Sequence, residues 1–130
     1  FAYRGRAAPY TVNVLFAASE LAAALLEGKG YECSITETHH IHKKDAPSGT
    51  AKTLAGIVAS SMNCPEPQIT SIREGEVPGI HTLEMTSYCD RLTFTHEAFS
   101  REGFAAGAIV AALACVNLTG VHEFKDIILK

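Results

Sequence analysis

The sequence lacks closely spaced cysteines. The four that it has are Cys33, Cys64, Cys89 and Cys115, and neighbouring ones are at least 25 positions apart with no C-x-x-C pair. Cysteine-based zinc sites and small disulfide-rich folds both depend on short spacings. The spacing therefore argues against such a zinc site and against a dense disulfide framework. It favours reduced thiols in a cytoplasmic protein.

An excess of positive charge and a long apolar run are also missing. The formal net charge is -3, which does not suit a broad nucleic-acid-binding surface. The apolar stretches at 14–26 and 104–118 are interrupted by polar residues and glycine, and the first ten residues contain no apolar core of a signal peptide. We expect neither a nucleic-acid nor a membrane partner. A small anionic ligand needs only a few local donors and remains compatible with this charge.

What is present suits one packed domain, since 47% of the 130 residues are hydrophobic. Residue periodicity predicts helices at 12–27, 50–62 and 101–118, main strands at 31–38, 69–74, 80–88 and 92–98, and a short final strand at 124–129. Thr11 is expected to cap the first helix, and Gly28 and Gly30 to end it. No strand is apparent in the first ten residues.

This order of elements predicts an α+β fold. We expect a mixed, mostly antiparallel sheet of about four strands, with helices packed on one face. The opposite face then needs cover, and a partner subunit can supply it.

The most unusual segment is ETHHIHKKDAPSGT, residues 37–50, which leads from a predicted strand into a predicted helix through Pro47, Ser48, Gly49 and Thr50. The first turn of a helix offers unpaired N–H groups and a partial positive charge. Gly49 lets the backbone come close to a ligand. The segment therefore predicts a cradle for a carboxylate or phosphate, although the same residues also suit an ordinary helix N-cap.

Basic side chains crowd the same segment, namely His39, His40, His42, Lys43 and Lys44. A histidine and a lysine within reach of one ligand can donate protons near neutral pH. A solvated basic loop is one alternative. Zinc binding by His39, His40 and His42 is another, but a fourth ligand at a defined spacing is not evident.

The acidic residues of this segment suit supporting roles. Glu37, at the strand end, is placed to orient a histidine by a hydrogen bond. Asp45, before Ala-Pro, is expected to brace the loop through backbone hydrogen bonds. No G-x-S-x-G motif surrounds Ser48, so nucleophilic catalysis finds less support.

Three stretches carry a family resemblance. ETHHIHKKDAPSGTA resembles the signature E-x-H-H-x-x-K-x-D-A-P-S-G-T-A of dihydrodipicolinate reductases, now called 4-hydroxy-tetrahydrodipicolinate reductases. REGEVPGIHT (73–82) resembles the family's Arg-x-Gly…Gly-x-His-Thr hairpin. LTFTHEAFSREGFAAGAIVAA (92–112) resembles its His-x-Ala-x-x-Arg-x-x-Phe-Ala-x-Gly-Ala segment. The resemblance covers about residues 12–130.

This resemblance implies an activity and roles for residues. The family reduces a cyclic unsaturated dicarboxylate to tetrahydrodipicolinate, on the route to diaminopimelate and lysine, with NADPH or NADH. His39 matches the family's proton donor or acceptor, Lys43 its second proton donor, and His40 a substrate-binding histidine. The residues that match groups holding a substrate carboxylate are Ser48, Gly49 and Thr50.

Further positions match the family pattern more loosely. Arg101 and Phe104 resemble positions that approach the cofactor when the domains close. His81 and His96 belong to the pattern, and we interpret both as structural. The family's C-terminal domains join their sheets into a tetramer, so the resemblance implies a homotetramer.

The sequence departs from the family in one respect. Family members begin with a nucleotide-binding domain that carries a glycine-rich loop, and no G-x-G-x-x-G occurs here. We therefore expect residues 1–130 to be one substrate-binding and tetramerisation domain without the nucleotide-binding domain. Alone it would be inactive, because hydride transfer needs a positioned cofactor. The alternative is a non-catalytic, stand-alone ligand-binding or assembly domain.

Overall fold

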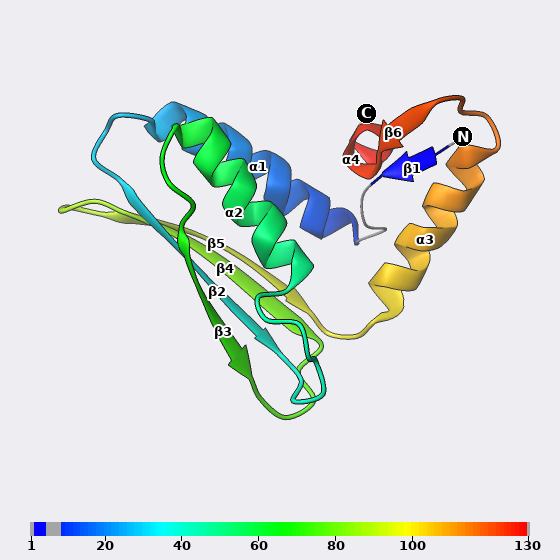
Figure 1. The fold of residues 1–130 in the computed structure, drawn as a ribbon, viewed down its shortest axis with the longest axis horizontal. Coiled ribbons are helices and arrows are strands. Elements are labelled where there is room, and N and C mark those ends of the chain that lie inside the picture. The colour runs from blue at the N-terminus through cyan, green and yellow to red at the C-terminus, as the bar shows by residue number, and fades with distance from the viewer. Residues whose placement is uncertain (1, 5–8, 130) are drawn as a thin grey trace. The chain divides into compact units, whose positions relative to one another are not determined.

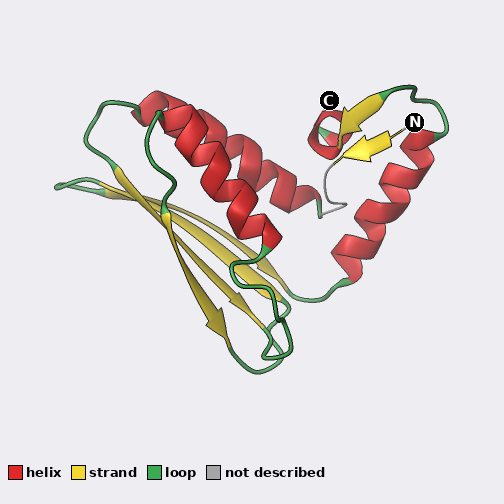
Figure 2. Ribbon diagram, in the orientation of Figure 1, coloured by secondary structure: helices red, strands yellow, loops and turns green. Residues whose placement is uncertain are grey.

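The structure is a computed structural model that describes residues 2–4 and 9–129. The order of its elements is β1 (Ala2–Arg4), α1 (Tyr10–Leu26), β2 (Glu32–His39), α2 (Gly49–Met62), β3 (Gln68–Arg73), β4 (Gly79–Thr86), β5 (Arg91–Ala98), α3 (Glu102–Cys115), β6 (Val121–Glu123) and α4 (Phe124–Ile128) (Figure 1). Figure 2 shows the same elements coloured by type. None of the described helices is long and apolar enough to cross a membrane.

The described chain divides into two compact units. Residues 15–99 form one unit, and the residues before 15 together with those from 100 onward form the other. The first contains most of α1, α2 and the four-stranded sheet. The second contains the start of α1, the strands β1 and β6, and the helices α3 and α4.

The sheet of residues 15–99 has the order β3-β2-β4-β5. β2 and β3 are parallel, and α2 forms the crossover between them, as parallel neighbours require. β4 runs antiparallel to both β2 and β5. This mixed, mostly antiparallel sheet confirms the predicted fold class. The register places His39 beside Arg73 and Glu37 beside His81.

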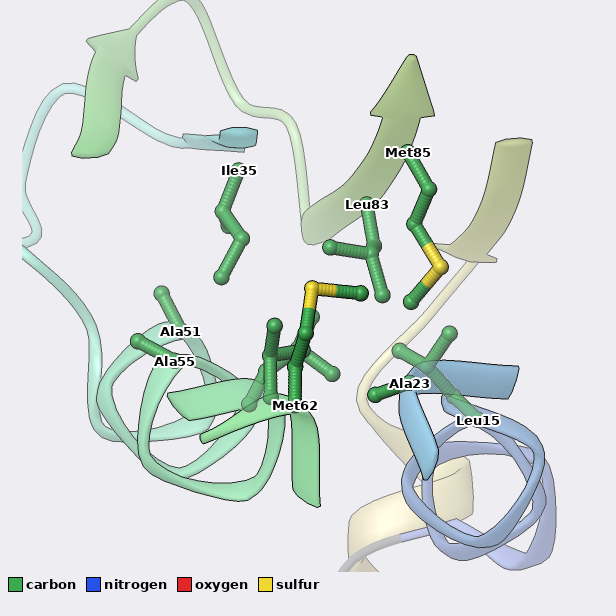
Figure 3. Packing of buried hydrophobic residues seen from close by; sticks show 10 residues of the cluster. Leu15, Ala23, Ile35, Ala51, Ala55, Met62, Leu83 and Met85 are labelled. Atoms are coloured by element: carbon green, nitrogen blue, oxygen red, sulfur yellow. The ribbon is translucent and has the colours of Figure 1, made fainter. Parts of the chain in front are cut away.

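Helices α1 and α2 lie on one face of this sheet (Figure 1). Figure 3 shows the core between these helices and the sheet, where the fully buried Leu83 and Met85 of β4 meet side chains from both helices. The core residues are Leu15, Ala23, Ile35, Ala51, Leu54, Ala55, Val58, Met62, Leu83 and Met85. Within residues 15–99 no helix covers the opposite face, where the hydroxyls of Thr82 and Thr95 lie 3.1 Å apart.

Two expectations about the chain ends were wrong. The first helix begins at Tyr10, so Thr11 lies inside it and is not its cap. The final strand predicted at 124–129 is instead α4, preceded by β6, which pairs in parallel with β1. A short apolar run is compatible with the two-residue period of a strand and with the 3.6-residue period of a helix. Here Phe124 and Ile128 are buried four positions apart, which is the helical spacing.

Strand β1 was missed because three residues carry too little periodicity to be recognised. The end of the first helix was predicted correctly, since Gly28 and Gly30 follow α1 with φ of 70° and 80°. These left-handed conformations suit glycine.

Candidate active site

The signature segment forms the connection from the end of β2 to the start of α2. Its first part lies against the turn between β3 and β4. The Ile41 N–H donates to the Gly75 carbonyl at 3.1 Å, and the Glu74 N–H donates to the His39 carbonyl at 2.9 Å. The segment is therefore held next to the sheet end from which His39 and Arg73 project.

A carboxylate with no exposed surface, Glu37, lies at the centre of this region. Its Oε1 accepts hydrogen bonds from Arg73 Nη2 at 2.9 Å and from the Ser48 N–H at 3.3 Å. Its Oε2 is paired with Nδ1 of His39. The predicted hydrogen bond between Glu37 and a histidine is thus present, and the histidine is His39.

Two opposing effects act on the pKa of Glu37. Burial, the largest single effect, would raise this pKa, but hydrogen bonds from Arg73, Ser71 and His39 together lower it below its ordinary value. Glu37 is therefore a stable carboxylate at neutral pH. It can hold the proton on Nδ1 of His39, which leaves Nε2 as the basic nitrogen of a neutral ring.

His39 is 8% exposed at the end of β2. Burial lowers its pKa, and the bond to Glu37 opposes that shift only partly. Its ring approaches Gly79 so closely that an added Cβ there would lie 3.1 Å from Nε2. The ring also meets His81 edge to face, with centroids 5.0 Å apart. A largely neutral histidine in this position can exchange a proton near neutral pH.

Ser48 is the N-cap of α2, and its hydroxyl is already engaged. Its Oγ accepts from the Ala51 N–H at 3.2 Å and lies 2.9 Å from Nε2 of His81. A neutral His81 nitrogen can accept the hydroxyl proton, which satisfies both groups. What remains for an anion is the backbone N–H groups of Gly49 and Thr50 in the first turn, together with the half-buried Thr50 side chain.

The lysine of the signature lies near the same helix start along the chain. Lys43 Nζ forms an ion pair with Asp45 Oδ1 at 3.0 Å, and the Lys43 side chain is 22% exposed. The Asp45 carbonyl accepts from Arg73 Nη2 at 2.6 Å, and bracing of the loop by the Asp45 side chain stays a prediction. A carboxylate ligand could replace Asp45 as the partner of Lys43.

The remaining predicted residues are His40, Arg101 and Phe104. The rings of His40 and His42 lie together with centroids 5.9 Å apart, and His42 is largely exposed. Arg101 and Phe104 lie at the beginning of α3, in the other unit. Their role toward a cofactor, and that of His40 toward substrate, stay predictions.

The metal alternative based on His39, His40 and His42 does not match the arrangement of ligand atoms. Among the described residues, the group whose atoms converge within 4.8 Å is Glu37, His39 and His81. Glu37 and His81 already bond other groups, and the Arg73 guanidinium lies on the same carboxylate. The positive charge of Arg73 disfavours a cation at this point.

The sequence model of the family described as dihydrodipicolinate reductase, C-terminus, matches residues 11–128. The chain belongs to this family. Curated relatives named 4-hydroxy-tetrahydrodipicolinate reductase include those of Christiangramia forsetii, 39% identical over 90% of this chain, and Methanopyrus kandleri, 36% identical over 90%. These alignments cover 54% and 49% of the relatives, so the chain spans about half the length of the curated relatives it matches.

A solved structure has a similar fold. It is described as dipicolinate-bound dihydrodipicolinate reductase from Paenisporosarcina sp. TG-14, with a TM-score of 0.71 and 21% identity. The match covers 89% of this chain and 50% of that one. At this identity the likeness supports the fold alone, and it agrees with the predicted α+β domain of the dihydrodipicolinate reductase family.

The sequence alone predicts no site role for two residues that contact the Glu37–His39 pair. Arg73 is the first residue of the hairpin motif, and the sequence pattern favours a structural role for His81. Both lie more than 30 positions from His39, and β-sheet register brings them together with it. The available signal was an arginine and a histidine at the two ends of one short motif, REGEVPGIH.

We expect the free energy of unfolding to fall as the pH is lowered from about 6.5 to about 4. Burial, helped by His39, lowers the pKa of His81 from 6.5 to about 4. Between these values the unfolded chain binds a proton at His81 and the folded chain does not, so acid favours unfolding. The contribution is about 3 kcal/mol. Denaturant titrations across this pH range measure it.

The variant His81→Gln should flatten this pH dependence, and His42→Gln, at an exposed histidine, should leave it unchanged. An equal dependence in wild type and His81→Gln would contradict the buried, neutral state of His81.

Proposed function

We propose that the chain is the substrate-binding half of a cytoplasmic 4-hydroxy-tetrahydrodipicolinate reductase. The full protein would reduce a cyclic unsaturated dicarboxylate to tetrahydrodipicolinate with NADPH or NADH. The observation that carries this proposal is the buried Glu37–His39 pair next to the capped start of α2. It joins a proton-transfer group to a site for a carboxylate.

Two observations support a dicarboxylate as the ligand. The N–H groups of Gly49 and Thr50 and the charge of Lys43 suit a carboxylate. The similar structure from Paenisporosarcina is described as dipicolinate-bound, and dipicolinate is a planar ring with two carboxylates. His40 would contact the substrate beside Lys43, as the family resemblance implies.

The proton would come from His39 or Lys43. Glu37 fixes the His39 ring and stabilises its protonated form, so His39 can give a proton to the ring atom that becomes electron-rich on reduction and can regain one from solvent. Lys43 can donate directly or restore the proton of His39. In the full protein, a nicotinamide cofactor would supply the hydride. The described residues contain no glycine-rich strand-to-helix turn for a dinucleotide.

The second candidate is a non-catalytic ligand-binding or assembly domain. The sheet face of residues 15–99 that no helix of this unit covers is the observation that favours it, because an uncovered face suits assembly. Both candidates predict ligand binding. They differ in whether this chain supports turnover, dependent on His39, when it replaces the matching half of a full-length relative.

The chain should bind pyridine-2,6-dicarboxylate, and Lys43→Ala should weaken this binding by about tenfold or more, because a charged hydrogen bond to the ligand is lost. Lys44→Ala is the matched control, since it removes the same charge from the adjacent, exposed position. Calorimetric titration measures both.

A second pair of variants tests the cradle at α2. Thr50→Val should weaken binding, and Thr53→Val, at an exposed position of the same helix, should not. Equal affinities for Lys43→Ala and Lys44→Ala would show that Lys43 does not bind the ligand. No binding by the wild-type chain would contradict a preformed substrate half-site.

We also propose that the chain assembles into a homotetramer through the sheet. In residues 15–99 both α1 and α2 lie on the same face, and the other face carries Thr82 and Thr95 on neighbouring strands. Polar side chains such as these hydroxyls can pack against the same face of another copy.

We expect Thr95→Arg to dissociate the assembly, because a charge at the middle of such an interface loses its hydration. Sedimentation velocity should show about four chains per particle for wild type and a smaller particle for the variant. Thr53→Arg, at an exposed position of α2, is the control and should assemble normally. A wild-type monomer would contradict the tetramer.

A further inference from the structure

One arginine holds the signature segment in place. Arg73, the last residue of β3, donates from Nε to the Lys43 carbonyl at 3.1 Å and from Nη2 to the Asp45 carbonyl at 2.6 Å. The same Nη2 bonds Oε1 of Glu37 at 2.9 Å, and Nη1 donates to the Ile72 carbonyl at 2.9 Å. All three nitrogens of the guanidinium are therefore engaged.

These bonds join two parts of the site that are separate in sequence. The acceptors at Lys43 and Asp45 belong to the loop that carries the proposed substrate lysine. The acceptor at Glu37 belongs to the carboxylate that orients His39. A rigid planar fork with several donors can hold such acceptors at fixed relative positions, and a lysine cannot.

We propose that Arg73 is a positioning residue that locks the Lys43 loop to the Glu37–His39 pair. This inference rests on the proposed function, because it assigns Arg73 to the same substrate site. Arg73 need not touch the substrate. Its effect reaches the ligand through the backbone at Lys43 and through the Glu37 carboxylate.

The positioning role of Arg73 can be measured through the protonation of His39, because charged groups surround this histidine. The groups that face or surround His39 are Glu37 on β2, Lys43 in the loop, Arg73 on β3 and His81 on β4. Without Arg73, buried Glu37 loses its strongest compensating hydrogen bond, and His39 loses a nearby positive charge. The coupled pair should then take up its proton at a higher pH.

The test compares Arg73→Gln and Arg73→Lys with Arg91→Gln. Arg91 is an exposed arginine on β5, 3.8 Å from Glu84, and serves as the matched control. The first measurement is the NMR titration of the His39 imidazole. We expect it to move to higher pH in Arg73→Gln and to stay unchanged in Arg91→Gln. A role in stability alone would not move this titration in a folded variant.

The second measurement is hydrogen exchange at the Ser48 N–H, which donates to Glu37. We expect faster exchange in both Arg73 variants. The third is the affinity for pyridine-2,6-dicarboxylate, which should fall about tenfold in both. Arg73→Lys keeps the charge, so its His39 titration should remain closer to wild type while its affinity still falls.

The proposal is overturned if folded Arg73→Gln matches wild type in His39 titration and Ser48 exchange. If that variant does not fold, Arg73→Lys decides, and unchanged Ser48 exchange in it overturns the proposal. Failure of the wild-type chain to bind the dicarboxylate bears on the proposed function instead. The titration and exchange measurements need no ligand and still decide the role of Arg73.

Discussion

A carboxylate buried without contact with water must be compensated, and this requirement organises the site. Glu37 has no exposed surface, and an uncompensated charge there would cost several kcal/mol. Its two oxygens are compensated by Arg73, His39 and the Ser48 N–H. These partners come from β3, from β2 and from the start of α2, so one buried charge fixes three elements relative to one another.

The same bonds prepare the site for its chemistry. Glu37 sets the orientation of His39, and the Ser48 N–H that bonds Glu37 belongs to the cap of the helix whose first turn can bind a carboxylate. The proposed proton donor, His39, and the proposed anion cradle are therefore positioned by one group. In residues 15–99 the packed core on one face of the sheet holds this end of β2 rigid, which precise proton transfer needs.

Sequence reasoning was successful where the signal is local. The alternating strands, the helix after Ser48 and the bond from Glu37 to a histidine follow from residue spacing within a short stretch. Arg73 and His81 reach the site only through the pairing of β2 with β3 and β4, and periodicity does not specify which strands are neighbours. The strand predicted at 124–129 was wrong because a short apolar run fits a helix equally well.

The most direct measurement of the central claim is a double-mutant cycle between Glu37 and Arg73. Free energies of unfolding would be compared for wild type, Glu37→Gln, Arg73→Gln and the double variant. If the buried charge organises the site, each single variant loses about 3 kcal/mol, since it leaves one charge without its partner. The double variant should then lose little more than either, a coupling of about 2 kcal/mol. Additive losses would show that the two residues act independently and would contradict the account.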